Sequence, residues 1–175
     1  RFETVPYEPA TPVTAGLIKI EPLRPRRPSA PFEALRDKAD AHAAKAGAPP
    51  RIFLANLGTI PEFNARATFA QNFFAAAGIE AVSNDGFKTS ADAAKAFAGS
   101  GAEVVCLCSS DANYALLAEA TAQALLNAGA RHVVLAGRPG DKEAAYRGAG
   151  IASFIFAGCD APQTLSDLQA VLGIQ

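Results

Sequence analysis

Histidine is scarce in this chain of 175 residues, which contains His42 and His132 and no third. This scarcity limits the available metal and acid–base chemistry, because imidazole is the commonest metal ligand and catalytic base. The cysteines are also few, namely Cys106, Cys108 and Cys159. An odd, sparse set excludes a disulfide framework and favours a reducing, cytoplasmic location.

Neither an excess of charge nor a long apolar run marks the sequence. Its 16 basic and 17 acidic residues leave a net charge of −1, and we therefore expect no nucleic-acid partner, which would require a basic surface. No apolar run approaches the ~20 residues that span a bilayer, so we also expect no membrane partner. The glycine-rich motifs that hold the phosphates of nucleotides are missing as well.

Proline divides the chain near residue 50, because nine of the twelve prolines lie within the first fifty residues. Proline restricts the backbone and removes an amide donor, so we expect an extended arm over 1–31 that orders only against a partner or a neighbouring domain. The arm carries Arg24, Arg26 and Arg27. We favour a solvated linker or a partner-binding strap for this cluster over an anion site.

Apolar residues at helical spacing predict a linker helix over 31–46, ended by Gly47. The arm and this helix together form a first region, 1–48. The remainder, 49–175, is expected to form one domain.

Short apolar runs alternate with helical segments after residue 50. The expected strands are 52–57, 79–83, 103–108, 132–135 and 153–156, and the expected helices are 64–77, 90–98, 111–127, 142–148 and 161–172. Strands that are apolar throughout are typical of parallel sheets with both faces covered. We therefore predict an α/β fold, a flavodoxin-like doubly wound five-stranded parallel sheet with the order 2-1-3-4-5.

Ligands of such folds bind beyond the carboxyl ends of the strands. The corresponding loops, rich in small and polar residues, are 56–64, 84–88, 109–113, 136–140 and 157–160. Ser109, Ser110 and Asp111 could supply a nucleophile, but we favour a helix N-cap, since they directly precede a predicted helix. His132 opens a strand at the other end of the sheet and His42 precedes the domain, so no Ser–His pair is expected.

Three motifs between Phe32 and Gly173, LANLGT, AGRPG and FIFAGCD, resemble the carboxy-terminal domain of methylmalonyl-CoA mutase small (β) subunits. The catalytic subunits of that family carry a flavodoxin-like cobalamin-binding domain marked by Asp-x-His-x-x-Gly, Ser-x-Leu and Gly-Gly. Here the first of the corresponding loops, 59–65, lacks both the Asp and the His. Cys108 to Ser110 lack the Leu, and Arg138 follows Gly137 in place of a second glycine.

The resemblance therefore implies a degenerate cobalamin-binding-like domain with no catalytic residue and no metal ligand. The residues expected to line its altered pocket are Gly58, Glu62, Ser109, Ser110, Gly137 and Gly158. The resemblance also implies a heterodimer with a large catalytic subunit, which would interconvert methylmalonyl-CoA and succinyl-CoA with its own adenosylcobalamin. Two alternatives stay open: a module that still binds cobalamin or another nucleotide-like ligand weakly, and a small free-standing enzyme.

Overall fold

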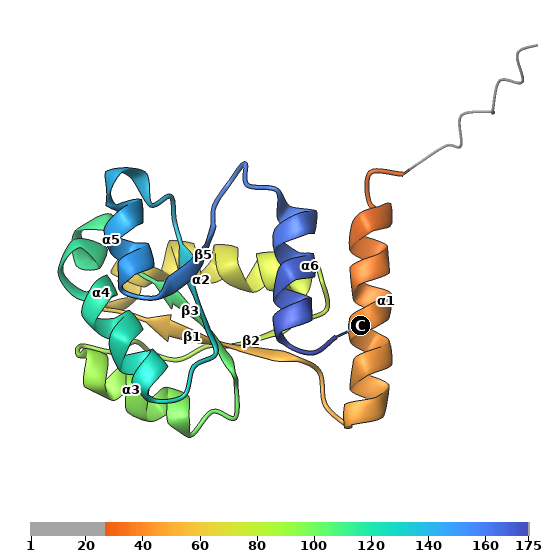
Figure 1. Ribbon diagram of the computed structural model, residues 1–175, viewed down its shortest axis with the longest axis horizontal. Helices are drawn as coiled ribbons and strands as arrows, with labels where there is room; N and C mark the ends of the chain where they lie inside the picture. Colours follow the sequence, from red (N-terminus) through yellow and green to blue (C-terminus); the bar gives the residue numbers. More distant parts are fainter. Residues whose placement is uncertain (1–26, 175) are drawn as a thin grey trace, which may run out of the picture.

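Five parallel strands form a sheet in the computed structural model, which describes residues 27–174 (Figure 1). The strands are β1 (Arg51–Asn56), β2 (Glu80–Val82), β3 (Val104–Cys108), β4 (His132–Ala136) and β5 (Ile151–Ile155). Their order, β2-β1-β3-β4-β5, confirms the prediction. The chain moves from β1 outward to β2 and then back to β3, so the switch point lies between β1 and β3, where Asn56 pairs with Cys108.

Helices cover both faces of this sheet (Figure 1). They are α1 (Ala30–Ala46), α2 (Ile60–Ala75), α3 (Ser90–Ala98), α4 (Asp111–Asn127), η1 (Gly140–Lys142), α5 (Glu143–Gly148) and α6 (Ala161–Val171). One buried cluster joins the sheet to α3, α4 and α5 through Phe97, Leu125 and Tyr146. A second cluster joins the opposite face to α1, α2 and α6 through Leu35, Phe74 and Leu165.

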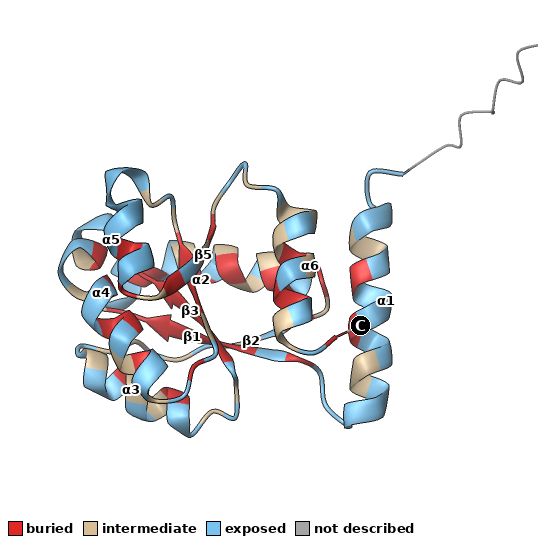
Figure 2. Cartoon of the chain, in the orientation of Figure 1, coloured by how far each residue is buried: buried red, intermediate tan, exposed pale blue. Residues whose placement is uncertain are grey.

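The burial of the central strands explains why their apolar runs predicted strands from the sequence. All five residues of β3 are buried, and every residue of β1 after Arg51 is buried as well (Figure 2). Apolar area removed from water contributes about 25 cal/mol per Å², so a strand covered on both faces favours apolar residues at every position.

Helix α2 begins four residues before the expected start, and this corrects the sequence-based description of the first loop. Thr59 is the N-cap, Pro61 lies in the first turn, and Glu62 closes a capping box with Thr59. The expected loop 56–64 is therefore largely the first turn of a helix. Thr59-x-x-Glu62 with Pro61 between them is a recognised helix start, and it lies before the first periodic apolar residues of the helix. Helix α3 begins at Ser90 as expected, with Thr89 as its N-cap.

The predicted linker helix is confirmed as α1, which Gly47 ends in the left-handed conformation. Gln169 of α6 ties it to the domain, because its Nε2 donates to the carbonyl oxygens of Leu35 at 2.7 Å and Ala77 at 3.1 Å. The predicted arm lies outside the described residues up to residue 26, as do Arg24 and Arg26. Arg27 forms an exposed ion pair of 2.8 Å with Glu33.

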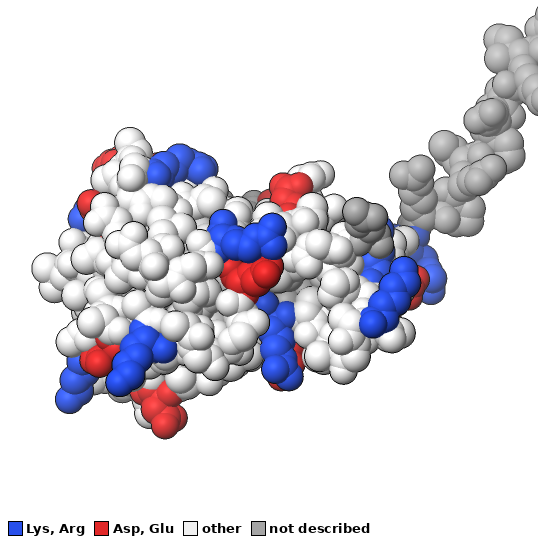
Figure 3. Space-filling view, turned by 60° about the horizontal axis from the view of Figure 1, so that its bottom comes forward, with Lys and Arg blue, Asp and Glu red and all other residues white. Residues whose placement is uncertain are grey.

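The surface carries charges of both signs in small groups. On the face drawn in Figure 3, Lys and Arg lie beside Asp and Glu, with wide uncharged areas between them. Among residues 27–174, no helix combines the length and apolar character needed to cross a bilayer.

Candidate functional site

The carboxyl ends of β1 and β3 bring four of the predicted pocket residues together. Gly58 follows β1, Glu62 lies in the first turn of α2, and Ser109 and Ser110 link β3 to α4. Asn113 joins them, since a Cβ built on Gly58 would lie 2.5 Å from Glu62 Oε2 and 2.6 Å from Asn113 Nδ2. The side chains of α2 and α4 therefore fill the space directly above Gly58.

Glu62 is held by its own helix start. Its Oε2 accepts hydrogen bonds from the backbone N–H of Thr59 at 2.6 Å and from the Thr59 hydroxyl at 2.7 Å. These bonds lower the pKa of the Glu62 carboxyl, the backbone bond more than the hydroxyl bond. A carboxylate stabilised in this way is a helix cap and a poor general base.

The hydroxyl groups of Ser109 and Ser110 form hydrogen bonds with backbone groups. Ser109 is fully buried, and its hydroxyl donates to the carbonyl oxygen of Leu57 at 2.6 Å while it accepts from Asn113 Nδ2 at 3.1 Å. Ser110 accepts from the N–H of Asn113 and caps α4, which confirms the expected cap. Neither hydroxyl has an imidazole partner, because His132 bonds Ser153 at the opposite end of the sheet.

Tyr114 is a residue of this cluster that sequence reasoning missed. Its hydroxyl accepts from the N–H of Ser109 at 3.0 Å. The hydroxyl oxygen lies 2.8 Å from the carbonyl oxygen of Leu107 and 2.9 Å from that of Ala136, and it can donate to either. Burial raises the pKa of this hydroxyl well above its usual value. Tyr114 therefore acts as a neutral clamp between the ends of β3 and β4, and nothing in the sequence separates it from an ordinary core tyrosine.

The loop after β2 folds over the end of β1. Asn56 is fully buried and donates to Ser83 Oγ at 3.2 Å and to the carbonyl oxygen of Asn84 at 3.0 Å. Asn84 in turn donates to the carbonyl oxygen of Leu54 at 2.6 Å. A Cβ on Gly86 would lie 2.6 Å from the carbonyl oxygen of Gly58, so the two backbones meet with no room between them.

Arg66 is the second residue that sequence reasoning missed. It stands one turn after Glu62 on α2, and it donates to the carbonyl oxygen of Ser109 at 2.7 Å and to Asp111 Oδ1 at 2.6 Å. Its guanidinium carbon also lies 4.9 Å from the centre of the Tyr114 ring. Its partners Ser109 and Asp111 lie 43 and 45 residues further along the chain, so no local sequence pattern identified it.

Gly137 and Gly158 lie apart from the other four predicted residues, at the ends of β4 and β5. A Cβ on Gly137 would lie 3.3 Å from the Arg66 guanidinium, and one on Gly158 would lie 3.6 Å from Arg138 Nη2. Gly137 lines a cavity of about 420 Å³ beside Arg66, Arg138 and Phe156. Arg138 lies over the Phe156 ring at 4.8 Å and donates to the carbonyl oxygen of Ala157.

The remaining ionisable groups do not converge on this edge of the sheet. Burial raises the pKa of the Cys106 thiol well above its usual value, and partial burial lowers the pKa of His132. Cys106, Cys108 and Cys159 are free thiols. Within residues 27–174, no three His, Cys, Asp or Glu side chains are grouped so that they could hold a metal ion. The described side chains at this edge form hydrogen bonds that stabilise the backbone. None of them pairs a nucleophile with a neighbouring base.

Similar proteins were found by sequence. The chain is 46% identical over 151 residues to the methylmalonyl-CoA mutase small subunit of Streptomyces virginiae, covering 86% of this chain and 23% of that protein. It is 39% identical over 156 residues to a probable methylmalonyl-CoA mutase small subunit of Mycobacterium tuberculosis strain H37Rv, covering 87% and 25%. It is 35% identical over 175 residues to the methylmalonyl-CoA mutase small subunit of Propionibacterium freudenreichii subsp. shermanii, covering 99% and 26%.

The chain thus spans about a quarter of the length of the curated relatives that it matches. No protein-family model matches it. Among solved structures, a response regulator receiver protein from Burkholderia phymatum superposes with a TM-score of 0.48 and 16% identity, over 72% of this chain and 97% of that one.

Proposed function

We propose, from the homology of this chain to methylmalonyl-CoA mutase small subunits, that it is the non-catalytic carboxy-terminal domain of such a subunit. Its role is to support a large catalytic subunit that interconverts methylmalonyl-CoA and succinyl-CoA with adenosylcobalamin. The observation that carries the proposal is the 46% identity to one small subunit over 86% of this chain. The word "small" in the relatives' name implies a larger partner.

The filled switch point supports a non-catalytic role. The place where this fold accepts ligands is occupied by Glu62 and Asn113 above Gly58 and by the close approach of Gly86 to the Gly58 carbonyl. Ser109 bonds the carbonyl oxygen of Leu57, and Asn56 Nδ2 bonds Ser83 and the carbonyl oxygen of Asn84, while Asn56 Oδ1 is buried without a hydrogen-bond partner. Such an arrangement stabilises the domain and leaves no pair of groups free for proton transfer.

The same residues fit a cobalamin poorly. A protein imidazole that replaces the base below cobalt needs a histidine after β1, and residues 58–67 contain none. Glu62 is the nearest ionisable side chain, but it is engaged by Thr59, and a hard carboxylate is a weak substitute for imidazole nitrogen. We therefore assign the adenosylcobalamin to the partner subunit.

The test is to mix the chain with a purified large subunit and to follow the complex by size-exclusion chromatography and by turnover of methylmalonyl-CoA. Co-elution with the large subunit, with no succinyl-CoA formed by the chain alone, is the expected result. Turnover by the chain alone would overturn the non-catalytic assignment. Separate elution at micromolar concentrations of both proteins would contradict the proposal that this chain supports the large subunit.

The cavity beside Gly137 favours a second candidate function, a module that binds cobalamin or another nucleotide-like ligand weakly. Two guanidinium groups, those of Arg66 and Arg138, line this space of about 420 Å³ and could contact phosphate oxygens. Both have partners already, in Asp111 and the Ala157 carbonyl. Calorimetric titration with ATP would separate the two functions, because saturable binding abolished by Arg138→Ala would favour the module.

A further inference from the structure

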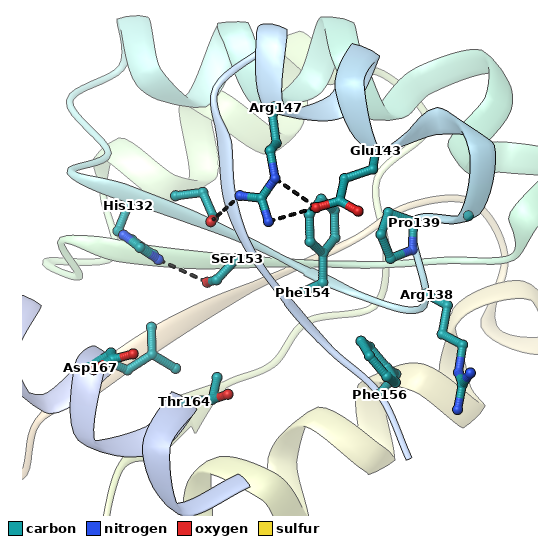
Figure 4. A pocket seen from close by; sticks show the side chains of 13 residues that line it. His132, Arg138, Pro139, Glu143, Arg147, Ser153, Phe154, Phe156, Thr164 and Asp167 are labelled. Atoms are coloured by element: carbon teal, nitrogen blue, oxygen red, sulfur yellow. Dashed lines mark hydrogen bonds and ion pairs between the residues drawn. The ribbon is translucent and has the colours of Figure 1, made fainter. Parts of the chain in front are cut away.

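A groove runs along the free edge of β5, away from the switch point. β5 ends the strand order, so no strand within residues 27–174 pairs with its outer side. A cavity of about 650 Å³ lies along this edge, between α5 and α6 (Figure 4). Glu143 and Arg147 stand on the α5 side, and Thr164 and Asp167 stand on the α6 side.

Backbone groups of β5 point into this groove. The carbonyl oxygen of Ile155 accepts from the N–H of Gly137 at 2.9 Å, which turns Ile155 toward β4. Backbone groups alternate in direction along a parallel strand, so those of Phe154 face outward. Arg147 Nη1 donates to the carbonyl oxygen of Ala152 at 3.0 Å, in the place where the N–H of a further strand would bond. Such an edge is a template for another strand.

The described part of the chain begins beside α6, the helix that also forms one wall of this groove. The first turns of α1 and α6 line a common cavity, with Pro31 and Ala34 on one side and Pro162 and Gln163 on the other. At about 10 Å between packed helices, and about as much again from α6 to the sheet edge, the groove lies about 20 Å from the start of α1. An extended chain covers about 3.3 Å per residue, so about seven residues cross this distance.

Counting back seven positions from Arg27 reaches Ile20, at the end of a distinctive stretch. Residues 13–21 form the longest proline-free run before α1, and Val13, Leu17, Ile18 and Ile20 make it apolar. Lys19 is the only charged residue between 13 and 20. Each wall of the groove carries a carboxylate, Glu143 on α5 and Asp167 on α6, so the groove suits a segment with one lysine.

We propose that residues 13–20 add to the sheet as a sixth strand, in the groove between α5 and α6 and parallel to β5. The direction follows from the path of the chain, which must leave the groove at the carboxyl end of β5 to reach the start of α1. The connection from the added strand through α1 to β1 then runs across the sheet in the same direction as the connection from β1 through α2 to β2. Helices α1 and α2 also lie on the same face of the sheet. The connection from the added strand thereby obeys the right-handed rule for parallel strands.

The arm's many prolines agree with this arrangement, since Pro12 and Pro22 bracket the segment and stop the pairing at its two ends. Docking exchanges the bond from Arg147 to the Ala152 carbonyl for a backbone bond. It also covers the outward N–H groups of Phe154 and Phe156, which lie on the groove floor.

Hydrogen exchange of the whole chain tests the proposal, with Ile18→Pro as the disrupting variant and Thr4→Pro as the matched control. The amides of Phe154 and Phe156 are expected to be protected in the unmodified chain and in Thr4→Pro. In Ile18→Pro they should exchange about tenfold faster or more, because proline removes a donor from the middle of the added strand. The Ile155 amide, which faces β4, should stay protected in all three and reports an intact domain.

Equal, fast exchange of Phe154 and Phe156 in all three proteins would overturn the proposal. Protection that Ile18→Pro leaves unchanged would overturn it too. Protection that disappears on dilution of the unmodified chain would assign the groove to a second copy of the protein.

Discussion

Arg66 Nη1 donates a 2.7 Å hydrogen bond to the carbonyl oxygen of Ser109, and this bond joins the second turn of α2 to the end of the central strand. The same guanidinium reaches Asp111 in the first turn of α4 and lies over the ring of Tyr114. One side chain thus connects three elements at the edge of the sheet where ligands of this fold bind.

Arg66→Met should therefore destabilise the domain by about 1.5–3 kcal/mol, the usual range for a hydrogen bond from a charged group to a partly buried acceptor. Urea unfolding followed by circular dichroism would measure the change. Arg36→Met, at an exposed position of α1, is the matched control and should stay within about 0.5 kcal/mol of the unmodified chain. Equal effects of the two variants would contradict the bracing role of Arg66.

Gly58→Ala should cost more stability than Gly129→Ala. Both glycines have positive φ, +91° and +100°, so the backbone cost is similar. Only at Gly58 must neighbours move, since Glu62 Oε2 and Asn113 Nδ2 stand where the new methyl group would lie. Their displacement breaks a helix cap, worth about 1 kcal/mol. Thermal unfolding of the two variants gives the difference, which should shrink when Glu62→Ala is present in both.

Glu62 should make stability depend on pH in the acidic range. The bonds from Thr59 hold its folded pKa below the ordinary value of 4.5, so the folded state binds its proton less readily than the unfolded state does. The stabilisation is therefore present above the unfolded pKa and is lost as pH falls through the folded pKa. The unfolding free energies of the unmodified chain and of Glu62→Gln should differ at neutral pH and converge in acid. Glu119→Gln, on the exposed side of α4, serves as the control. A difference that is constant over this pH range would argue against the cap.

Hydroxocobalamin should not acquire a protein imidazole on mixing with this chain. The expected visible spectrum is that of the free cofactor, or of a weak complex that retains its own base. A solution of hydroxocobalamin with free imidazole provides the reference spectrum. A tight complex with that reference spectrum would mean that a histidine reaches cobalt, and the degenerate-domain proposal would then fail.

Only part of the candidate site could be predicted from the sequence. Ser110 was identified as a helix cap because the signal is local, a serine directly before a helical run. The periodic apolar pattern puts Glu62 in a loop, because it predicts a helix only from position 64, although Thr59-x-x-Glu62 indicates an earlier start. Arg66 and Tyr114 gave no local signal, since their partners Ser109, Asp111 and Ala136 are distant in the chain.

The sequence by itself determined the strands, most helices and the order of the sheet, because apolar runs buried on both faces and right-handed crossovers leave few arrangements open. Only the tertiary structure decided what happens at the switch point. Whether the space above Gly58 stays open or is filled depends on how Glu62 and Asn113, from two different helices, meet over one glycine. Their contact depends on how α2 and α4 pack against the sheet. The residue spacing within either helix does not predict it.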